Sequence, residues 1–261
     1  APLSIKPVLL FYGMVQLLKA CLLTVDPQYP ESTSVLAHGV STRKRKKQSY
    51  EFSQDEVKIQ KNGLFTHFSE KMFHVKHLEG EKYAMNELLK RIPELSNLFK
   101  LHYQSDHFCK IGKQQEGLLT FPISLLDRYH MTARRLQDFL NEALPFQTEV
   151  REENTVEKNT LTFQMVDNKD INPFNSSPLY YHLYEDSFYI PTNRDDLVIF
   201  PEIMVHYLLL YNLSMISRYE TEWWSELLHS YSSNDYPFIN QFLSVSAEKV
   251  PYLLYLFLKQ Q

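Results

Sequence analysis

Glycine is scarce in this chain, and cysteine is scarcer still. Six glycines in 261 residues leave no glycine-rich phosphate loop, and there is no Cys-x-x-Cys, His-Glu-x-x-His or Gly-x-Ser-x-Gly sequence. These absences argue against a P-loop nucleotide hydrolase and a helical zinc protease. Cys21 and Cys109 are too few for a disulfide framework. We therefore expect a thiol-reducing, cytoplasmic setting.

The chain also lacks an overall positive charge and an uninterrupted long apolar run. A formal net charge of −4 excludes a globally basic nucleic-acid coat, so any anion site must be a local patch. The apolar stretch Val8–Leu23 is interrupted by Gln16 and Lys19, and no cleavage site of small residues follows it. The apolar run 252–258 is shorter than the roughly 20 residues that span a bilayer. We therefore expect no membrane partner.

Aromatic residues, in contrast, are abundant, with 17 Tyr and 17 Phe. Few glycines and many aromatics favour packed helices over a turn-rich sandwich. Apolar residues recur at helical spacing over 8–22 and again over 201–216, where the helix is apolar almost all round and is expected to be buried. The same reasoning predicts helices at 84–92, 93–103, 124–144, 219–231, 236–243 and 246–259. The predicted class is therefore mainly α: a helical domain with a small β-hairpin and a few short strands.

The predicted hairpin lies between residues 57 and 68. Val57–Gln60 and Leu64–Phe68 flank Lys61-Asn62-Gly63, and Asn-Gly between two apolar-alternating runs is the strongest short-range hairpin signal. Further short strands are expected at 117–123, 161–166 and 180–190. Residues 145–178 are polar and are expected to form a loop excursion from a single domain over residues 1–261.

A basic run is the clearest local charge feature. It consists of Arg43, Lys44, Arg45, Lys46 and Lys47. With Lys58 and Lys61 nearby, and after subtraction of three acidic residues, the net charge over residues 41–61 is +4. Such a patch binds phosphates through charge and counterion release without reading sequence. The alternative is a solvated loop whose lysines only keep the chain soluble.

Two groups of histidines have spacings that metal ligands use. They are His74 with His77, and His102 with His107 and Cys109. The two groups lie on separate predicted elements, whereas zinc requires four well-placed ligands. The pattern therefore favours unrelated histidines, and we expect no metal and no cofactor.

Several stretches together resemble a known family. They are Phe11–Leu23, Ala37-His38-Gly39, the basic stretch 41–46, and Val57–Phe65. In these stretches the chain closely resembles the YaaC-like family of Bacillus-type bacteria, and the resemblance extends over the whole length. That family carries no established activity, so the resemblance implies a fold without a function. Its members begin with additional residues, which implies that residues preceding Ala1 are missing here.

A weaker resemblance is to HEPN domains, helical bundles of which some are metal-independent ribonucleases. Phe11–Leu23 is similar to their aromatic-rich second helix. Lys61-Asn62-Gly-Leu-Phe-Thr-His67 has the spacing of their catalytic motif, with Lys in place of Arg. The resemblance implies a general base at His38 or His67, with Lys61 and the basic run on the scissile phosphate. The predicted hairpin competes for the same residues, because it needs Asn62-Gly63 in a turn.

The function that the sequence favours is a non-catalytic helical module that binds an anionic partner, RNA or a nucleotide, through residues 38–61. The basic run and Lys58 are the expected contacts. The first alternative is a degenerate HEPN-type ribonuclease. The second is a protein-interaction scaffold that acts through the aromatic C-terminal helices, with a protein partner or a second copy of the chain.

Overall fold

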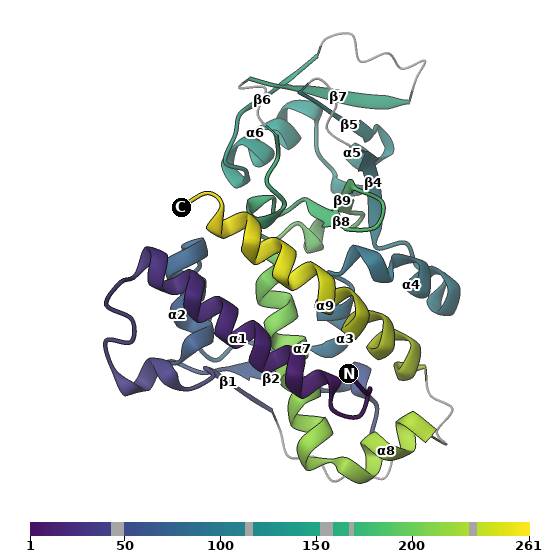
Figure 1. Cartoon of the computed structure of the whole chain (residues 1–261). Helices are drawn as coiled ribbons and strands as arrows, with labels where there is room; N and C mark the ends of the chain where they lie inside the picture. The colour runs from purple at the N-terminus through teal and green to yellow at the C-terminus, as the bar shows by residue number, and fades with distance from the viewer. Residues whose placement is uncertain (43–49, 113–116, 152–158, 167–169, 230–233) are drawn as a thin grey trace. The chain divides into compact units, whose positions relative to one another are not determined.

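The computed structural model describes residues 1–42, 50–112, 117–151, 159–166, 170–229 and 234–261. These residues form two compact units (Figure 1). The first unit combines Ala1–Leu98 with Ile203–Gln261, so the two ends of the chain fold together. The second unit is Phe99–Glu202, and the two units are described separately below.

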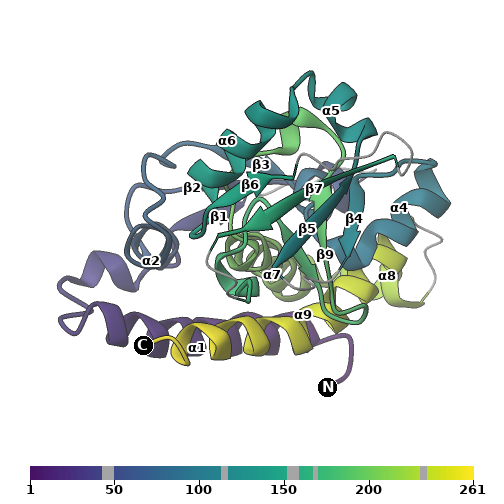
Figure 2. The same cartoon turned by 90° about the horizontal axis from the view of Figure 1, so that it is seen from above.

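The first unit contains three long helices: α1 (Lys6–Val25), α7 (Glu202–Tyr219) and α9 (Asp235–Leu258). Helices α1 and α9 lie side by side and run in the same direction (Figures 1 and 2). Lys6 Nζ donates a hydrogen bond to Ser244 Oγ at 3.4 Å near the start of α1. Every residue of α7 from 203 to 214 is buried, which confirms the expected buried helix.

A small antiparallel sheet accompanies these helices in the order β1 (Val40–Thr42), β2 (Glu56–Ile59) and β3 (Lys82–Ala84). In β2, Val57 and Ile59 are buried while Lys58 is exposed, so one face of the sheet packs on the core and the other faces solvent. The shorter elements of the unit are η1 (Thr33–Leu36), η2 (Phe52–Gln54), α2 (Leu64–Phe73), α3 (Met85–Leu89), η3 (Pro93–Leu95) and α8 (Thr221–His229).

The predicted hairpin at residues 57–68 is wrong, because its second half is helix α2. Gly63 does adopt a positive φ of 142°, but at the N-cap of α2 and not in a hairpin turn. A Cβ at Gly63 would lie 2.3 Å from the Cα of Gly39, so the two glycines let two backbone segments meet. The first amides of α2 donate to the carbonyls of residues 37 and 38. Long-range contacts therefore override the local turn signal.

The second unit holds two further antiparallel sheets. One has the order β4-β9-β8 and the other the order β5-β7-β6. Its elements are α4 (Ser96–Tyr103, which begins in the first unit), β4 (Phe108–Gly112), β5 (Leu118–Pro122), α5 (Ser124–Tyr129), α6 (Ala133–Ala143), β6 (Thr148–Val150), β7 (Thr160–Met165), η5 (Pro173–Asn175), β8 (Tyr180–His182), β9 (Ser187–Pro191) and η6 (Arg194–Asp196). The strands predicted at 117–123, 161–166 and 180–190 are confirmed by β5, β7 and the pair β8–β9. Residues 145–178, expected as a polar loop, contain β6 and β7.

The predicted fold class, mainly α with a few strands, is wrong. Within the described residues the helices are accompanied by three three-stranded antiparallel sheets, so the class is mixed α and β. The physical reason is strand length. Strands β1, β3 and β6 have three residues each, too few for the alternation of apolar and polar residues that predicts a strand.

Helix α1 is, among the described helices, the one that is long and apolar enough to cross a membrane by length and composition. One third of its apolar window is buried, and it packs beside α9 and α2. The core helix of a soluble protein and a signal sequence meet the same criterion.

Candidate functional site

The exposed face of the β1-β2-β3 sheet carries two lysines directly opposite each other. The register pairs Lys58 of β2 with Lys82 of β3, and Ser41 of β1 with Lys58 from the other side. Both lysines are exposed, and neither forms an ion pair with any residue that the structure describes. Side chains at such paired positions have Cβ atoms about 4.5–5.5 Å apart, and like charges there repel. Glu56 lies on the same face of β2, but neither lysine is neutralised by an ion pair among the described residues.

The predicted basic run Arg43–Lys47 lies outside the described residues. In the sequence it begins directly after Thr42, the last residue of β1. The sheet that carries Lys58 and Lys82 is thus also the sheet from which the chain enters the basic run.

His67, a candidate catalytic residue, lies on α2 and is bonded to a carboxylate. Its Nε2 is 2.8 Å from Oδ2 of Asp26, the residue that follows α1, and Lys71 Nζ is 3.4 Å from the same oxygen. Burial alone would raise the pKa of Asp26, but the hydrogen bonds from His67 and Lys71 outweigh it and hold this pKa below its ordinary value. The Tyr29 ring lies 5.3 Å from the His67 ring. This cluster ties the end of α1 to α2.

His38 has a different environment, among aromatic rings. Its ring centroid is 5.0 Å from Phe11 and 5.7 Å from Tyr211. Burial lowers the pKa of His38, and the positive charges of Arg218 and Lys19 lower it further, so the ring is neutral at pH 7. No described residue forms a hydrogen bond with its side chain.

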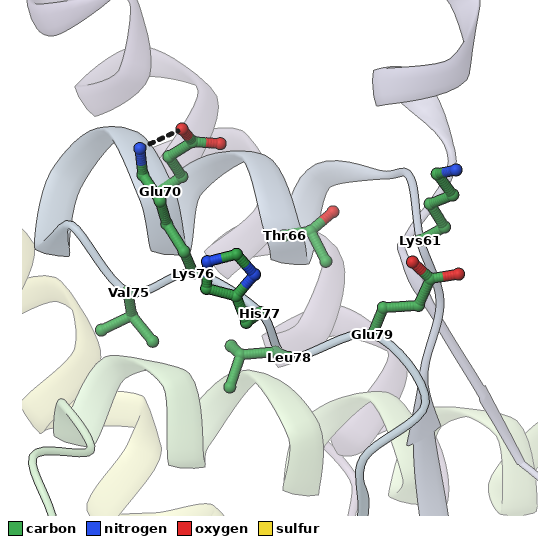
Figure 3. A pocket seen from close by; sticks show the side chains of 8 residues that line it. All are labelled: Lys61, Thr66, Glu70, Val75, Lys76, His77, Leu78 and Glu79. Atoms are coloured by element: carbon green, nitrogen blue, oxygen red, sulfur yellow. Dashed lines mark ion pairs between the residues drawn. The ribbon is translucent and has the colours of Figure 1, made fainter.

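Lys61 lines a surface pocket of about 270 Å³ at the start of α2 (Figure 3). Thr66 and His77 point into the same pocket, and Glu79 lies on the side of Lys61. Lys76 also lines the pocket but is neutralised by Glu70, with Nζ and Oε1 3.1 Å apart. Two lysines against two glutamates leave no net positive charge, so this pocket is a poor anion site.

The three residues predicted as catalytic candidates, His38, His67 and Lys61, therefore have separate neighbours. The backbone segments that carry them do meet, since Phe65 N donates to the His38 carbonyl at 3.1 Å. The His38 ring, however, faces α1 and α7, His67 faces Asp26, and Lys61 lines the pocket. Among the described residues these three side chains share no partner.

Sequence reasoning missed three residues that the structure places in these environments: Asp26, Lys82 and Arg218. Lys82 was missed because a strand of three residues gives no pattern of its own. Arg218 was missed because it lies just beyond the predicted apolar stretch 201–216, in the last turn of α7. Asp26 precedes Pro27 at the expected helix end, a position from which no partner can be predicted.

One cation of the first unit is buried and fully paired. Lys249 of α9 contacts both carboxylate oxygens of Glu94 in η3, at 2.8 and 2.9 Å, and both side chains are 0% exposed. A closed pair of this kind has no surface to offer a ligand. We assign it a structural role.

No group of three or more His, Cys, Asp or Glu residues in the described part of the chain is arranged to hold a metal ion. The histidines at 74, 77, 102 and 107 gather no such group there.

The fold and the site define a mixed α and β protein of two units, whose first unit presents a sheet face with unpaired lysines. The family model of YaaC-like proteins matches residues 1–258, so the chain belongs to the YaaC-like family. No curated protein and no solved structure matches the chain.

Proposed function

We propose that this protein is a non-catalytic module that binds an anionic partner, RNA or a nucleotide, through residues 38–61 together with Lys82. The observation that carries the proposal is the direct pairing of Lys58 with Lys82 on the exposed face of the sheet. The first strand of that sheet ends directly before Arg43–Lys47.

The physical reason lies in the energy of two like charges. Lysines held opposite each other repel, and the repulsion is relieved when an anion lies between them. A phosphate backbone supplies such anions at regular spacing, and its binding releases counterions into solution. A basic run that only kept the chain soluble would require no cations at fixed positions on the adjoining sheet.

The test is the salt dependence of binding to a short single-stranded RNA, followed by fluorescence anisotropy. Each phosphate contact contributes about 0.7 to the slope of log K against log salt for a single strand. We expect Lys58→Ala/Lys82→Ala to weaken binding and to reduce the slope by up to two contacts. Replacement of Arg43, Lys44, Arg45, Lys46 and Lys47 by Ala should reduce it further.

The matched control is Lys76→Ala/Lys100→Ala, which changes the net charge equally. Both lysines are exposed but already paired, Lys76 with Glu70 at 3.1 Å and Lys100 with Asp106 at 3.6 Å. We expect this variant to bind RNA as the intact chain does. Equal losses in the control and test variants would refute the proposed surface. Absence of RNA and nucleotide binding by the intact chain at low salt would refute the function itself.

A second candidate function is metal-independent RNA cleavage, and the observation that favours it is the Asp26–His67 hydrogen bond at 2.8 Å. His67 lies on helix α2, as the resemblance to HEPN domains implies, and not on the second strand of a hairpin. In a neutral ring, donation from Nε2 to Asp26 leaves Nδ1 as the basic nitrogen.

This second candidate is tested by an RNase assay in EDTA on the intact chain and on His67→Ala and His38→Ala. Cleavage that disappears with His67→Ala would establish an enzyme with His67 as its base. Cleavage that disappears only with His38→Ala would move the base to His38. Equal background in all three preparations would eliminate the ribonuclease.

A further inference from the structure

Arg218, in the last turn of α7, is a half-buried cation without a carboxylate partner among the described residues. Its Nε donates to the carbonyl of Ser214 at 3.0 Å, its Nη1 to the Tyr12 hydroxyl at 3.1 Å, and its Nη2 to the Met215 sulfur at 3.2 Å. These contacts fix the guanidinium without neutralising it. A partly desolvated charge that lacks a counter-ion is costly, and the cost falls when an anion binds.

The contacts also leave both terminal nitrogens of the guanidinium, Nη1 and Nη2, able to bind an anion. A guanidinium has five N–H donors, and three are used by the contacts above. One N–H on each terminal nitrogen therefore has no acceptor among the described residues. Each terminal nitrogen thus keeps a donor for an oxygen of a phosphate, the group that arginine binds through paired N–H donors.

Polar and aromatic side chains lie near the guanidinium of Arg218. The guanidinium carbon lies 5.6 Å from the Tyr12 ring and 5.2 Å from the Tyr219 ring, and Tyr219 is 67% exposed. The centroid of the His38 ring lies 6.0 Å from that of the Tyr12 ring. Besides burial, the positive charges of Arg218 and Lys19 lower the pKa of His38. A neutral imidazole without a side-chain partner offers one N–H donor, and Lys19 adds a second positive charge.

We infer that Arg218, Tyr12 and His38 form a binding site for the phosphate group of a nucleotide, with the exposed Tyr219 ring available to stack on the base. The inference rests on the proposed binding of RNA or a nucleotide and adds a second contact point to it. The site is built from α1, α7 and the segment before β1, and it uses neither Lys58 nor Lys82. The phosphate can belong to a free nucleotide or to an RNA chain, since the recognised chemistry is the same.

The test is an NMR titration of the full chain that follows the ring C–H signals of His38. The probes are AMP, inorganic phosphate and a short single-stranded RNA, at constant ionic strength. We expect AMP to shift the His38 signals saturably. We also expect AMP to bind at least about fivefold more tightly than inorganic phosphate, because stacking of a base on an aromatic ring adds affinity. A shift by RNA alone would still support the site and would identify the polymer as the source of the phosphate.

The second part of the experiment measures AMP binding by variants of Arg218. Arg218→Gln should weaken AMP binding at least about tenfold, because a lost pair of charge-assisted hydrogen bonds has this effect. Arg218→Lys, which keeps the charge and loses the fork, should give an intermediate loss. The matched control is Arg134→Gln, which removes an exposed charge on α6 and should bind as the intact chain does. If Arg218→Gln does not fold, the AMP affinity of Arg218→Lys and the titration of the intact chain still test the proposed site.

The inference is overturned if AMP and RNA leave the His38 signals unchanged, or if Arg218→Gln binds AMP as tightly as the control. Equal affinities for AMP and inorganic phosphate would refute the claim that the site recognises a nucleotide through stacking of its base. These failures are distinct from failure of the proposed function. RNA binding that depends on Lys58 and Lys82 but ignores Arg218 would retain the sheet face and reject this site.

Discussion

The cations of the first unit fall into two groups that differ in how their charge is balanced. Lys249 is 0% exposed and contacts both oxygens of Glu94, while His67 and Lys71 share the carboxylate of Asp26. In contrast, Lys58, Lys82 and Arg218 have no carboxylate partner among the residues described. The fold thus supplies a carboxylate counter-ion to the cations of the first group. Where it supplies none, the charge is available to an external anion.

The largest expected effect concerns the closed pair. Glu94→Gln leaves Lys249 buried opposite a neutral amide, and removal of one partner of a buried pair costs about 3–5 kcal/mol of unfolding free energy. Urea denaturation followed by circular dichroism measures this loss. The matched control, Glu94→Leu/Lys249→Met, removes both charges and should recover most of the stability. A loss of under about 1 kcal/mol in Glu94→Gln would show that the pair does not hold η3 to α9.

The next effect concerns the segment that positions His38. Gly63→Ala places a Cβ 2.3 Å from Gly39 Cα at a φ of 142°, so we expect a loss of about 1–3 kcal/mol in unfolding free energy. Gly13→Ala is the control, because its Cβ would meet nothing within 4 Å and alanine is the better helix former. Thermal denaturation should therefore show opposite shifts for the two variants. Equal shifts would contradict the close approach of the segments 37–39 and 61–63.

A smaller effect concerns the pH dependence of the bonds that Asp26 forms with His67 and Lys71. The pKa of Asp26 in the folded chain lies below its ordinary value of 3.8, so its bonds to His67 and Lys71 stabilise the fold above that pH. This stabilisation is lost as the pH falls from 3.8 through the lower folded value. The unfolding free energies of the intact chain and of Asp26→Asn should accordingly differ at pH 6 and converge once the pH falls below the lowered pKa of Asp26. A constant difference across this range would refute the pairing.

Sequence reasoning reached α1, α7 and several strands but not their contacts. It expected two helices at 236–243 and 246–259, where the structure has the single helix α9. The apolar run of α7 predicts burial because every face carries large side chains, and the structure agrees. The segment 61–68 was misassigned because Asn62-Gly63 has the same local signature before a hairpin and before a helix. The deciding contact, Gly63 against Gly39, joins residues 24 positions apart. Local patterns contain no information on such contacts.

The same limit applies to the candidate site. Lys58 and the basic run were found from charge alone. Lys82 could not be linked to Lys58 without the register of β2 with β3, and Arg218 could not be linked to His38 without the packing of α7 against α1. Pairing and burial determine which charges are compensated, and both are properties of the folded chain.

The most direct measurement of the central claim is a comparison of stability and RNA binding in one variant, Lys82→Glu. The substitution turns a repulsive cross-strand pair into an attractive one, so the unfolding free energy should rise by about 0.2–1 kcal/mol. It also removes a phosphate contact and adds a negative charge, so RNA affinity should fall and the salt slope should drop by about 0.7 or more. Greater stability together with weaker binding is the result we predict. Unchanged RNA affinity in this variant would contradict the claim that the unpaired lysines of the sheet serve an anionic partner.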